Sequence, residues 1–387
     1  MVDKRLFFAI VILINISIIA SYSLTSFTIL YFDYNELHFF IRQFIFGISG
    51  ILLIFFISQL DPDSKKVQNI MFVLLFISLL VVIVLPFLPS NLATASGGAK
   101  RWLRLGHISI APVEFLKIGI IYFLSWSYAR KVNESKKTIK HEALILIPYV
   151  ITFVLIIGYI YFTQNDLGQS LICLFLLFML AFFAGASKRI FFIGIVFVVI
   201  CGIFLILDNE RRIDRFLSWW YNIQNNIFSF VSENINTRIN TEPYQISHSL
   251  NAIANGGFSG TGLGLGIFKL GFLSDVHTDF VLAGISEETG LLGLGVICVL
   301  YIYIIVRIFK IAKLCENKTH FIFCSGIALL LCISFLMNGF GIISLIPLKG
   351  VAVPLLSYGG SSMWSICMGL GYVLMISKKI KRNKNKL

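Results

Sequence analysis

The sequence predicts an all-α, polytopic membrane protein with ten transmembrane helices. Of its 387 residues, 57% are hydrophobic and only 13% are charged, whereas about 25% of a typical soluble domain is charged. Apolar runs close to the ~20 residues that cross a bilayer recur along the whole length. Clusters of lysine and arginine separate many of these runs. Together these observations favour a single transmembrane domain over residues 1–387.

Ten apolar runs define the expected spans. The first is too long for the apolar core of a signal peptide and lacks a small-residue cleavage pattern, so we expect it to remain as a span. The spans cover residues 6–30, 38–59, 68–88, 110–129, 143–162, 167–185, 190–207, 279–306, 321–341 and 350–377. One long connection remains between the seventh and eighth spans, at about residues 208–278.

The distribution of positive charge predicts the orientation in the membrane. The formal net charge is +13, and 21 of the 32 lysines and arginines fall in six segments that ten spans would place on one side. These segments are Lys4–Arg5, Lys65–Lys66, Arg130–Lys140, Lys188–Arg189, Arg307–Lys318 and Lys378–Lys386. Such an excess marks the cytoplasmic side, so both termini are expected inside and the long connection outside. We expect the basic C-terminal segment to lie near anionic lipid headgroups, and we do not expect nucleic acid as a partner.

The cysteine and histidine patterns predict neither a disulfide framework nor a metal site. Six of the seven cysteines lie inside apolar runs, where cysteine behaves as a small hydrophobic residue. The sequence contains no C-x-x-C and no H-E-x-x-H pattern. No residues are therefore assigned to a metal.

The connection at residues 89–110 carries three cations on the side expected to be outside. Two interpretations stay open for Lys100, Arg101 and Arg104. In the first, these cations and Trp102 anchor a short helix at the lipid headgroups. In the second, the cations bind an anionic group such as a pyrophosphate. Both can hold at once.

Polar residues also occur where the fourth and sixth spans begin. Glu114 and Lys117 are three residues apart, so they can pair on one helix face, which lowers the cost of charge at membrane depth. Asp166 is placed to cap the helix that follows it. In each case the alternative is a contribution to the wall of a polar cavity.

The most unusual stretch is 256–290, where seven glycines precede an aspartate and a long apolar run. Glycine permits tight turns and a close approach to a ligand. Asp279 stands where this stretch should enter the membrane, and Glu287 and Glu288 lie inside the apolar run that follows. Carboxylates in such places are costly, which makes them candidates for a functional site or for the wall of a cavity.

The segments on either side of that stretch add further candidates. Before the glycines, Gln245 and Ser249 share one face of an expected helix. The start of the tenth span contains prolines, a glycine pair and hydroxyl residues, including Ser357 and Ser361. This pattern predicts a broken helix, which is tolerated only where it lines protein or a water-filled cavity. Lys349 is the single cation in the loop before it.

These motifs resemble those of the SEDS proteins of bacterial cell growth and division, in family order over nearly the whole sequence. The matching segments are GAKRWL at 98–103, P-x-E-F-x-K at 112–117, NDLG at 165–168, HTDF at 277–280 and KGVAVPLLSYGGSS at 349–362. The last segment is more similar to the division members of the family, FtsW, than to the elongation members, RodA.

The resemblance implies a peptidoglycan glycosyltransferase in the cytoplasmic membrane of a bacterium. Such an enzyme polymerises lipid II, an undecaprenyl-pyrophosphate-linked disaccharide peptide, into β-1,4 glycan on the outer face, here at the division septum. The implied partners are a class B penicillin-binding protein, which crosslinks the new strand, and other membrane proteins of the division complex. Asp279 matches the family's essential aspartate, and His277 belongs to the same motif.

The candidate residues fit the chemistry of glycan extension. The acceptor sugar needs a base for its hydroxyl group, and the departing pyrophosphate needs cations. Asp279 is the expected base, and Arg101, Arg104, Lys117 and Lys349 are the expected phosphate clamp. A divalent cation, magnesium or manganese, is the one cofactor left open, as an aid to the leaving group. Alternative functions are transport of lipid II across the membrane, an elongation polymerase and a non-catalytic scaffold.

Overall fold

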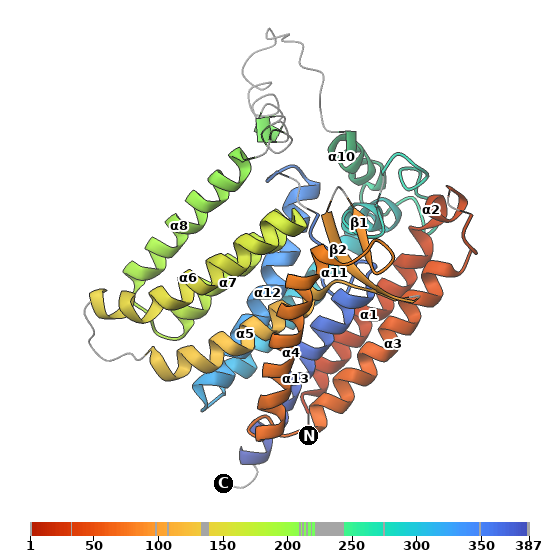
Figure 1. Ribbon diagram of the computed structural model, residues 1–387. Helices are drawn as coiled ribbons and strands as arrows, with labels where there is room; N and C mark the ends of the chain where they lie inside the picture. The colour runs from red at the N-terminus through yellow and green to blue at the C-terminus, as the bar shows by residue number, and fades with distance from the viewer. Residues whose placement is uncertain are drawn as a thin grey trace, which may run out of the picture.

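The computed structural model describes most of the chain as a bundle of long helices (Figure 1). It describes residues 2–31, 33–96, 99–106, 108–132, 139–208, 210, 213, 216–217, 219–220, 244–273, 275–347 and 350–384. The candidate Lys349 lies outside these residues, as does most of the long connection between the expected seventh and eighth spans.

Each of the ten expected spans overlaps one long helix. The helices are α1 (Lys4–Ser23), α2 (Ser26–Tyr31), α3 (His38–Gln59), α4 (Lys65–Val84), α5 (Pro112–Lys131), α6 (Ile139–Gln164), α7 (Leu167–Phe183), α8 (Lys188–Leu207), α10 (Tyr244–Gly256), α11 (Val281–Lys313), α12 (Lys318–Ile342) and α13 (Gly360–Lys384), with a 3-10 turn η1 (Leu85–Phe87) after α4. By length and composition, eight of the described helices can cross a membrane: α1, α3, α4, α6, α8, α11, α12 and α13.

Two of the ten expected spans do not correspond to any of those eight helices. The fourth corresponds to α5, which is 20 residues long but contains two charged residues at each end. The sixth corresponds to α7, which has 17 residues. Both are packed inside the bundle, because α5 contacts α4, α7, α12 and α13, and α7 contacts α5, α6, α8 and α12. Their neighbours therefore shield them from the surroundings of the bundle.

Three helix boundaries differ from the sequence prediction. The first span ends at Ser23, and the chain turns there before the short α2. The eighth begins at Val281 and continues to Lys313, with a kink at Gly290, whose φ of 68° lies in the left-handed region. The tenth is helical only from Gly360, so the predicted broken helix is confirmed as a non-helical segment, 350–359, ahead of α13.

The expectation of a short helix between residues 89 and 110 is wrong. This connection forms an antiparallel sheet in the order β1 (Ala93–Ser96), β2 (Ala99–Leu105) and β3 (Ile108–Ile110). Glycines flank β2 at both ends in the sequence, and Gly106 has a φ of 60° that suits the tight turn into β3. Glycine turns between short segments are typical of hairpins, so the fold is mostly but not entirely helical.

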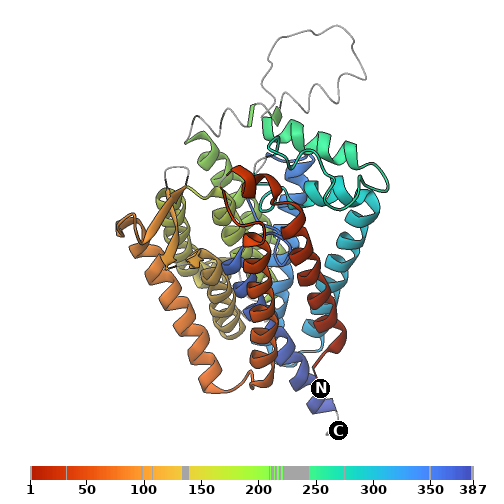
Figure 2. The same ribbon diagram turned by 90° about the vertical axis from the view of Figure 1, so that its right-hand side faces the viewer.

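The bundle has two distinct ends (Figures 1 and 2). Both chain termini lie at one end, which we call the terminal end. The sheet, α2 and α10 lie at the opposite end, which we call the loop end. Between them α13 packs mainly on α3, and α12 packs on α11, α5 and α7. The helices α12 and α13 form much of the buried core, whereas α8 is mostly exposed.

Candidate active site

Glu287 holds the glycine-rich segment 256–273 against the first turns of α11. Its carboxylate accepts hydrogen bonds from the backbone N–H groups of Ile267 (2.6 Å) and Phe268 (3.1 Å). The side chain of Asn255 donates a third, at 3.0 Å. Glu287 is almost fully buried, and a buried carboxylate needs such partners. It therefore serves as a structural support for the segment.

Glu288 fixes the same segment to the end of α1. Its carboxylate pairs with Lys269 at 2.6 Å, and both side chains are buried. Ser23 donates a further hydrogen bond to Glu288, at 2.7 Å from Oε1. The ammonium group of Lys269 also donates to the Ser23 carbonyl at 2.9 Å. This network joins α1, α11 and the glycine-rich segment.

Two glycines allow the segment to lie directly on the backbone of α11. A Cβ atom at Gly256 would lie 2.0 Å from the carbonyl oxygen of Ser286. One at Gly260 would lie 2.3 Å from the carbonyl oxygen of Glu288, and its φ of 82° is unfavourable for other residues. These two glycines are therefore explained by close packing against α11.

Asp279 lies at the loop end, two residues before α11 begins, and is half-buried. A Cβ atom placed on Gly350 would lie 2.7 Å from Oδ2 of Asp279, so the backbone of Gly350 contacts the carboxylate. Burial, together with repulsion from Asp275 and Asp166, raises the pKa of Asp279 to about 6, although Arg101 opposes this effect. A carboxylate with such a pKa is ionised at neutral pH and can accept a proton as a general base.

The non-helical segment 350–359 is bonded to the backbone beside Asp279. Ser357 donates from its hydroxyl group to the carbonyl oxygen of Thr278 at 2.6 Å. The backbone N–H of Tyr358 donates to the carbonyl oxygen of His277 at 2.9 Å. The candidate Ser357 therefore supports the loop that carries Asp279.

His277 packs as a neutral aromatic ring. Its ring centroid lies 5.3 Å from that of Phe39 and 5.6 Å from that of Tyr358. Burial lowers the pKa of His277, which favours the uncharged form. Its Nδ1 atom is buried and has no hydrogen-bond partner among the described residues.

Arg101 connects the sheet to the junction of α6 and α7. Its guanidinium group donates to the carbonyl oxygens of Gln164 (2.8 Å) and Asn165 (3.0 Å). Asp166 follows directly and caps α7, as predicted, by accepting from the backbone N–H of Gln169 at 3.1 Å. Arg101 and Asp166 both lie within electrostatic reach of Asp279. The structure therefore brings three of the candidates together.

The ion pair predicted between Glu114 and Lys117 is present. Their charged atoms lie 2.9 Å apart on the first turns of α5. Gln169 of α7 completes a closed network, because it accepts from Lys117 at 2.7 Å and donates to Glu114 at 3.0 Å. All three side chains are buried, so the charge of Lys117 is already neutralised within the bundle.

The remaining cationic candidates are less closely tied to Asp279. Arg104 is exposed on β2. It pairs with Ser109 of β3, whereas Arg101 lies at a register shift between β1 and β2, where the regular alternation of side chains is interrupted. Lys349 is not among the described residues, so its assignment stays a prediction.

The hydroxyl and amide candidates lie on α10 and α13. Ser249 is buried and donates to the carbonyl oxygen of Ile342 at 3.0 Å, which fixes α10 to the end of α12. Gln245 is half-buried near the start of α10. Ser361 is buried in the first turn of α13.

Three residues around this site were not among the candidates expected from the sequence. Arg42 of α3 is hydrogen-bonded to Tyr358. Its neighbour Gln43 donates to the backbone carbonyl of Ser357 at 3.4 Å. Asn338 of α12 donates to the carbonyl oxygen of Asp279. A charged or amide residue inside an apolar run is itself a signal of function, and it could have identified all three.

The described residues around Asp279 offer no ready cation site. In the described part of the chain, no three side chains of His, Cys, Asp or Glu are grouped closely enough to hold a metal ion. The acidic groups near Asp279 instead contribute to its electrostatic environment, as the raised pKa reflects.

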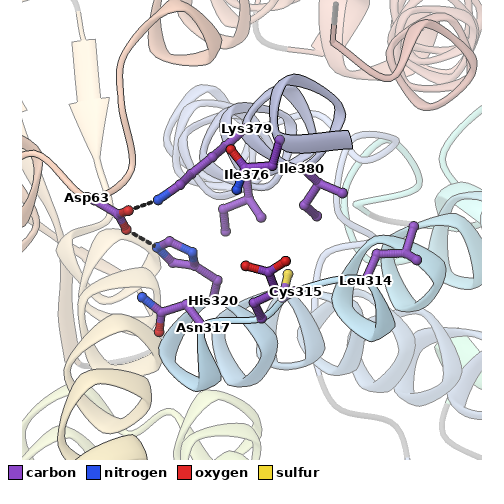
Figure 3. Close-up of a pocket in the computed structure, with 10 residues that line it drawn as sticks. Asp63, Leu314, Cys315, Asn317, His320, Ile376, Lys379 and Ile380 are labelled. Atoms are coloured by element: carbon purple, nitrogen blue, oxygen red, sulfur yellow. Dashed lines mark ion pairs between the residues drawn. The ribbon is translucent and has the colours of Figure 1, made fainter. Parts of the chain in front are cut away.

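A separate cavity of about 170 Å³ lies at the terminal end (Figure 3). Asp63 pairs there with both Lys379 and His320, the latter at 3.3 Å. His320 precedes Asn338 by 18 residues of α12, which corresponds to about 27 Å at ~1.5 Å per residue. This cavity therefore lies far from Asp279 and is not part of the same site.

The comparisons with known proteins agree with this architecture. Residues 4–382 match the family model for the cell cycle proteins FtsW, RodA and SpoVE. The chain is 42% identical over 385 residues to a probable peptidoglycan glycosyltransferase FtsW of Helicobacter pylori strain 26695, covering 98% of this chain and 99% of that protein. A Bacillus subtilis protein of the same name is 30% identical over 394 residues, covering 99% and 92%.

Two solved structures share the fold. One, described as "Structural coordination of polymerization and crosslinking by a peptidoglycan synthase complex", matches with a TM-score of 0.72 and 21% identity, over 98% of each chain. The rod shape determining protein RodA of Thermus thermophilus matches with a TM-score of 0.65 and 21% identity, over 98% of this chain and 97% of RodA. The resemblance found in the motifs is thus confirmed by a match over nearly the whole sequence, and the chain belongs to the FtsW, RodA and SpoVE family of cell cycle proteins.

Proposed function

We propose that this protein is a peptidoglycan glycosyltransferase that polymerises lipid II during septal wall synthesis. The observation that carries the proposal is the half-buried carboxylate of Asp279, whose raised pKa suits a general base. Relatives that match over nearly the full length are named probable peptidoglycan glycosyltransferases. Within the family, the division role rests on the FtsW names of those relatives and on the segment 349–362.

The proposal includes a ten-span topology for one domain over residues 1–387. It adds α5 and α7 to the eight helices that can cross a membrane. An even number of spans places both termini on the same side, in agreement with their position at one end of the bundle (Figure 1). The cationic segments assign that terminal end to the cytoplasm. The loop end, with Asp279, then faces outward, where lipid II would be used.

In the proposed reaction, Asp279 accepts the proton of the acceptor sugar hydroxyl. The hydroxyl oxygen attacks the anomeric carbon of the donor sugar, and the bond from that carbon to the pyrophosphate breaks. Undecaprenyl pyrophosphate leaves with the bonding electrons. A single displacement converts the donor's α-linkage into a β-1,4 bond.

Cations are needed where negative charge develops on the leaving group. Arg101, Arg104, Lys117 and Lys349 remain the proposed clamp, and the structure adds Arg42 as a further candidate. Lys117 would have to exchange part of its contact with Glu114 for phosphate. Magnesium or manganese could supply additional neutralisation. Most of the ligands would then come from the pyrophosphate itself, because the described side chains near Asp279 provide no cluster of three.

The polar candidates Gln245, Ser249, His277, Ser357 and Ser361 would shape the surface that receives the sugar and peptide portions of lipid II. The lipid tail would remain in the bilayer, in contact with the exposed apolar side chains of the outer helices. Such side chains are abundant on α3, α4 and α8, as expected for helices in contact with lipid.

A class B penicillin-binding protein is the proposed partner, together with other membrane proteins of the division complex. The chain itself would supply only glycan polymerisation, because no second set of catalytic residues is apparent in the sequence. One structure with the same fold was solved as part of a peptidoglycan synthase complex. We place the contact on the membrane-embedded surface and on the connection 208–278.

Lipid II polymerisation by the purified protein, with and without its penicillin-binding partner, tests the proposal. Asp279→Asn keeps the shape of the side chain and removes its proton acceptor, so polymerisation should fall by ~10²–10⁴. The variant should still insert into the membrane and bind its partner. Near-normal glycan synthesis by this variant would remove Asp279 from the mechanism. Movement of lipid II across a bilayer without polymer formation would indicate a transporter. The absence of both transport and polymerisation would indicate a scaffold.

A further inference from the structure

Asn338 bonds the backbone of Asp279 to the backbone of Val351. It lies near the end of α12 and is only 1% exposed. Its Nδ2 atom donates to the carbonyl oxygen of Asp279 at 2.6 Å and to that of Val351 at 2.9 Å. Both N–H groups of the amide are thus used to join two segments that are far apart in the sequence.

We propose that Asn338 is a positioning residue for the general base, because it holds the backbone of Gly350 and Val351 against the Asp279 carboxylate. This inference rests on the proposed function. The role differs from that of Asp279 itself, since Asn338 would act through the loop and would not touch the reacting sugar.

The contact at Gly350 shows why this position matters. Gly350 precedes Val351 directly, and a Cβ atom at Gly350 would lie 2.7 Å from Oδ2 of Asp279. The backbone therefore covers one side of the carboxylate. Asp279 is only half-buried, so the carboxylate remains partly accessible. The position of the 350–351 backbone then determines the direction from which an acceptor hydroxyl can reach it.

The orientation of the amide supports a specific need for its two donors. Oδ1 of Asn338 is buried and has no hydrogen-bond partner in the described part of the chain. An unsatisfied buried acceptor is unfavourable for stability. An apolar residue at this place would avoid that cost, but it could not join the two carbonyl groups.

The test is Asn338→Ala in the complex with the penicillin-binding partner, measured as lipid II polymerisation between pH 5 and pH 8. A displacement of about 1 Å at a reacting group can cost ~10²-fold, so we expect kcat to fall by about 10–100-fold. KM for lipid II should change little. The acidic midpoint of the rate should move below its position near pH 6, because water would reach the carboxylate and favour its ionised form.

Tyr301→Phe is the matched control. Tyr301 of α11 donates a buried hydrogen bond to the carbonyl oxygen of Pro354, in the same non-helical segment but away from Asp279. Its loss should leave kcat and the acidic midpoint unchanged. A second variant, Gly350→Ala, pushes the same backbone away from the carboxylate without touching α12. It should lower kcat as Asn338→Ala does, and it tests the importance of the 350–351 backbone position if Asn338→Ala does not fold.

Each outcome separates this inference from the proposed function. The positioning role alone would be overturned if Asp279→Asn is inactive but Asn338→Ala or Gly350→Ala has a normal kcat and an unmoved acidic midpoint. A smaller amount of folded Asn338→Ala protein with an unmoved midpoint would show a purely structural role. Activity retained by Asp279→Asn would overturn the proposed function itself.

Discussion

Acidification from pH 7 to pH 5 should lower the rate of glycan polymerisation about tenfold if Asp279 is the general base. Only the ionised carboxylate accepts a proton, so activity is present above its pKa and is lost as the pH falls through it. With a pKa of about 6, the ionised fraction falls from roughly 0.9 at pH 7 to roughly 0.1 at pH 5. An aspartate at its ordinary value of 3.8 would stay ionised over this whole range.

The assay is polymerisation of saturating lipid II by the purified complex, in buffers of equal ionic strength from pH 5 to pH 8. Thermal unfolding at each pH, and recovery of the rate after a return to pH 7, would exclude loss of folded protein. Burial lowers the pKa of His277 and so favours its uncharged form. A flat profile between pH 7 and pH 5 would refute a base with a raised pKa.

Three further predictions concern stability, topology and assembly. Lys269→Met leaves Glu288 buried without a counterion and should destabilise the protein by ~3–5 kcal/mol, measured by thermal unfolding in detergent. A double variant that adds Glu288→Gln should recover part of this stability. No recovery would contradict the pairing of Lys269 with Glu288. Cysteines introduced at Asn133 and Asn385 should be labelled from the cytoplasm and one at Asn236 from outside, whereas the reverse for Asn236 would overturn the ten-span count. The protein should co-purify with its penicillin-binding partner in mild detergent, and a fully active monomer would count against that partnership.

The features that sequence analysis predicted correctly depend on local signals. Apolar runs set the positions of the long helices, since length and composition alone decide whether a segment can cross a membrane. The ion pair of Glu114 and Lys117 follows from a spacing of three within one helix. The cap at Asp166 follows from its place before a helix. The break before α13 follows from prolines and glycines in one short segment.

The features that were missed or misread depend on contacts between distant segments. The roles of Glu287 and Glu288 could not be read from the sequence, because their partners lie 19 to 265 residues away. The use of Asn338 to join two loops is likewise visible only in three dimensions. The sheet at 93–110 was missed because the basic residues of β2 suggested an interfacial helix. The substrate contacts of the candidate residues stay predictions.

The ionised carboxylate of Asp279 is unfavourable for folding, and it lies beside segments that are held by hydrogen bonds and an ion pair. A shift of the Asp279 pKa from 3.8 to about 6 corresponds to about 3 kcal/mol, at ~1.36 kcal/mol per unit. Because the pKa is raised in the folded state, this cost is present above pH 6, where the carboxylate is ionised, and disappears below pH 4. Nearby contacts offset it, since Glu287 and Glu288 anchor the preceding segment and Ser357 bonds the backbone beside the acid. Ionised Asp279 thus lowers the stability of the folded protein at the pH where a general base must be ionised, as expected if Asp279 takes part in the reaction.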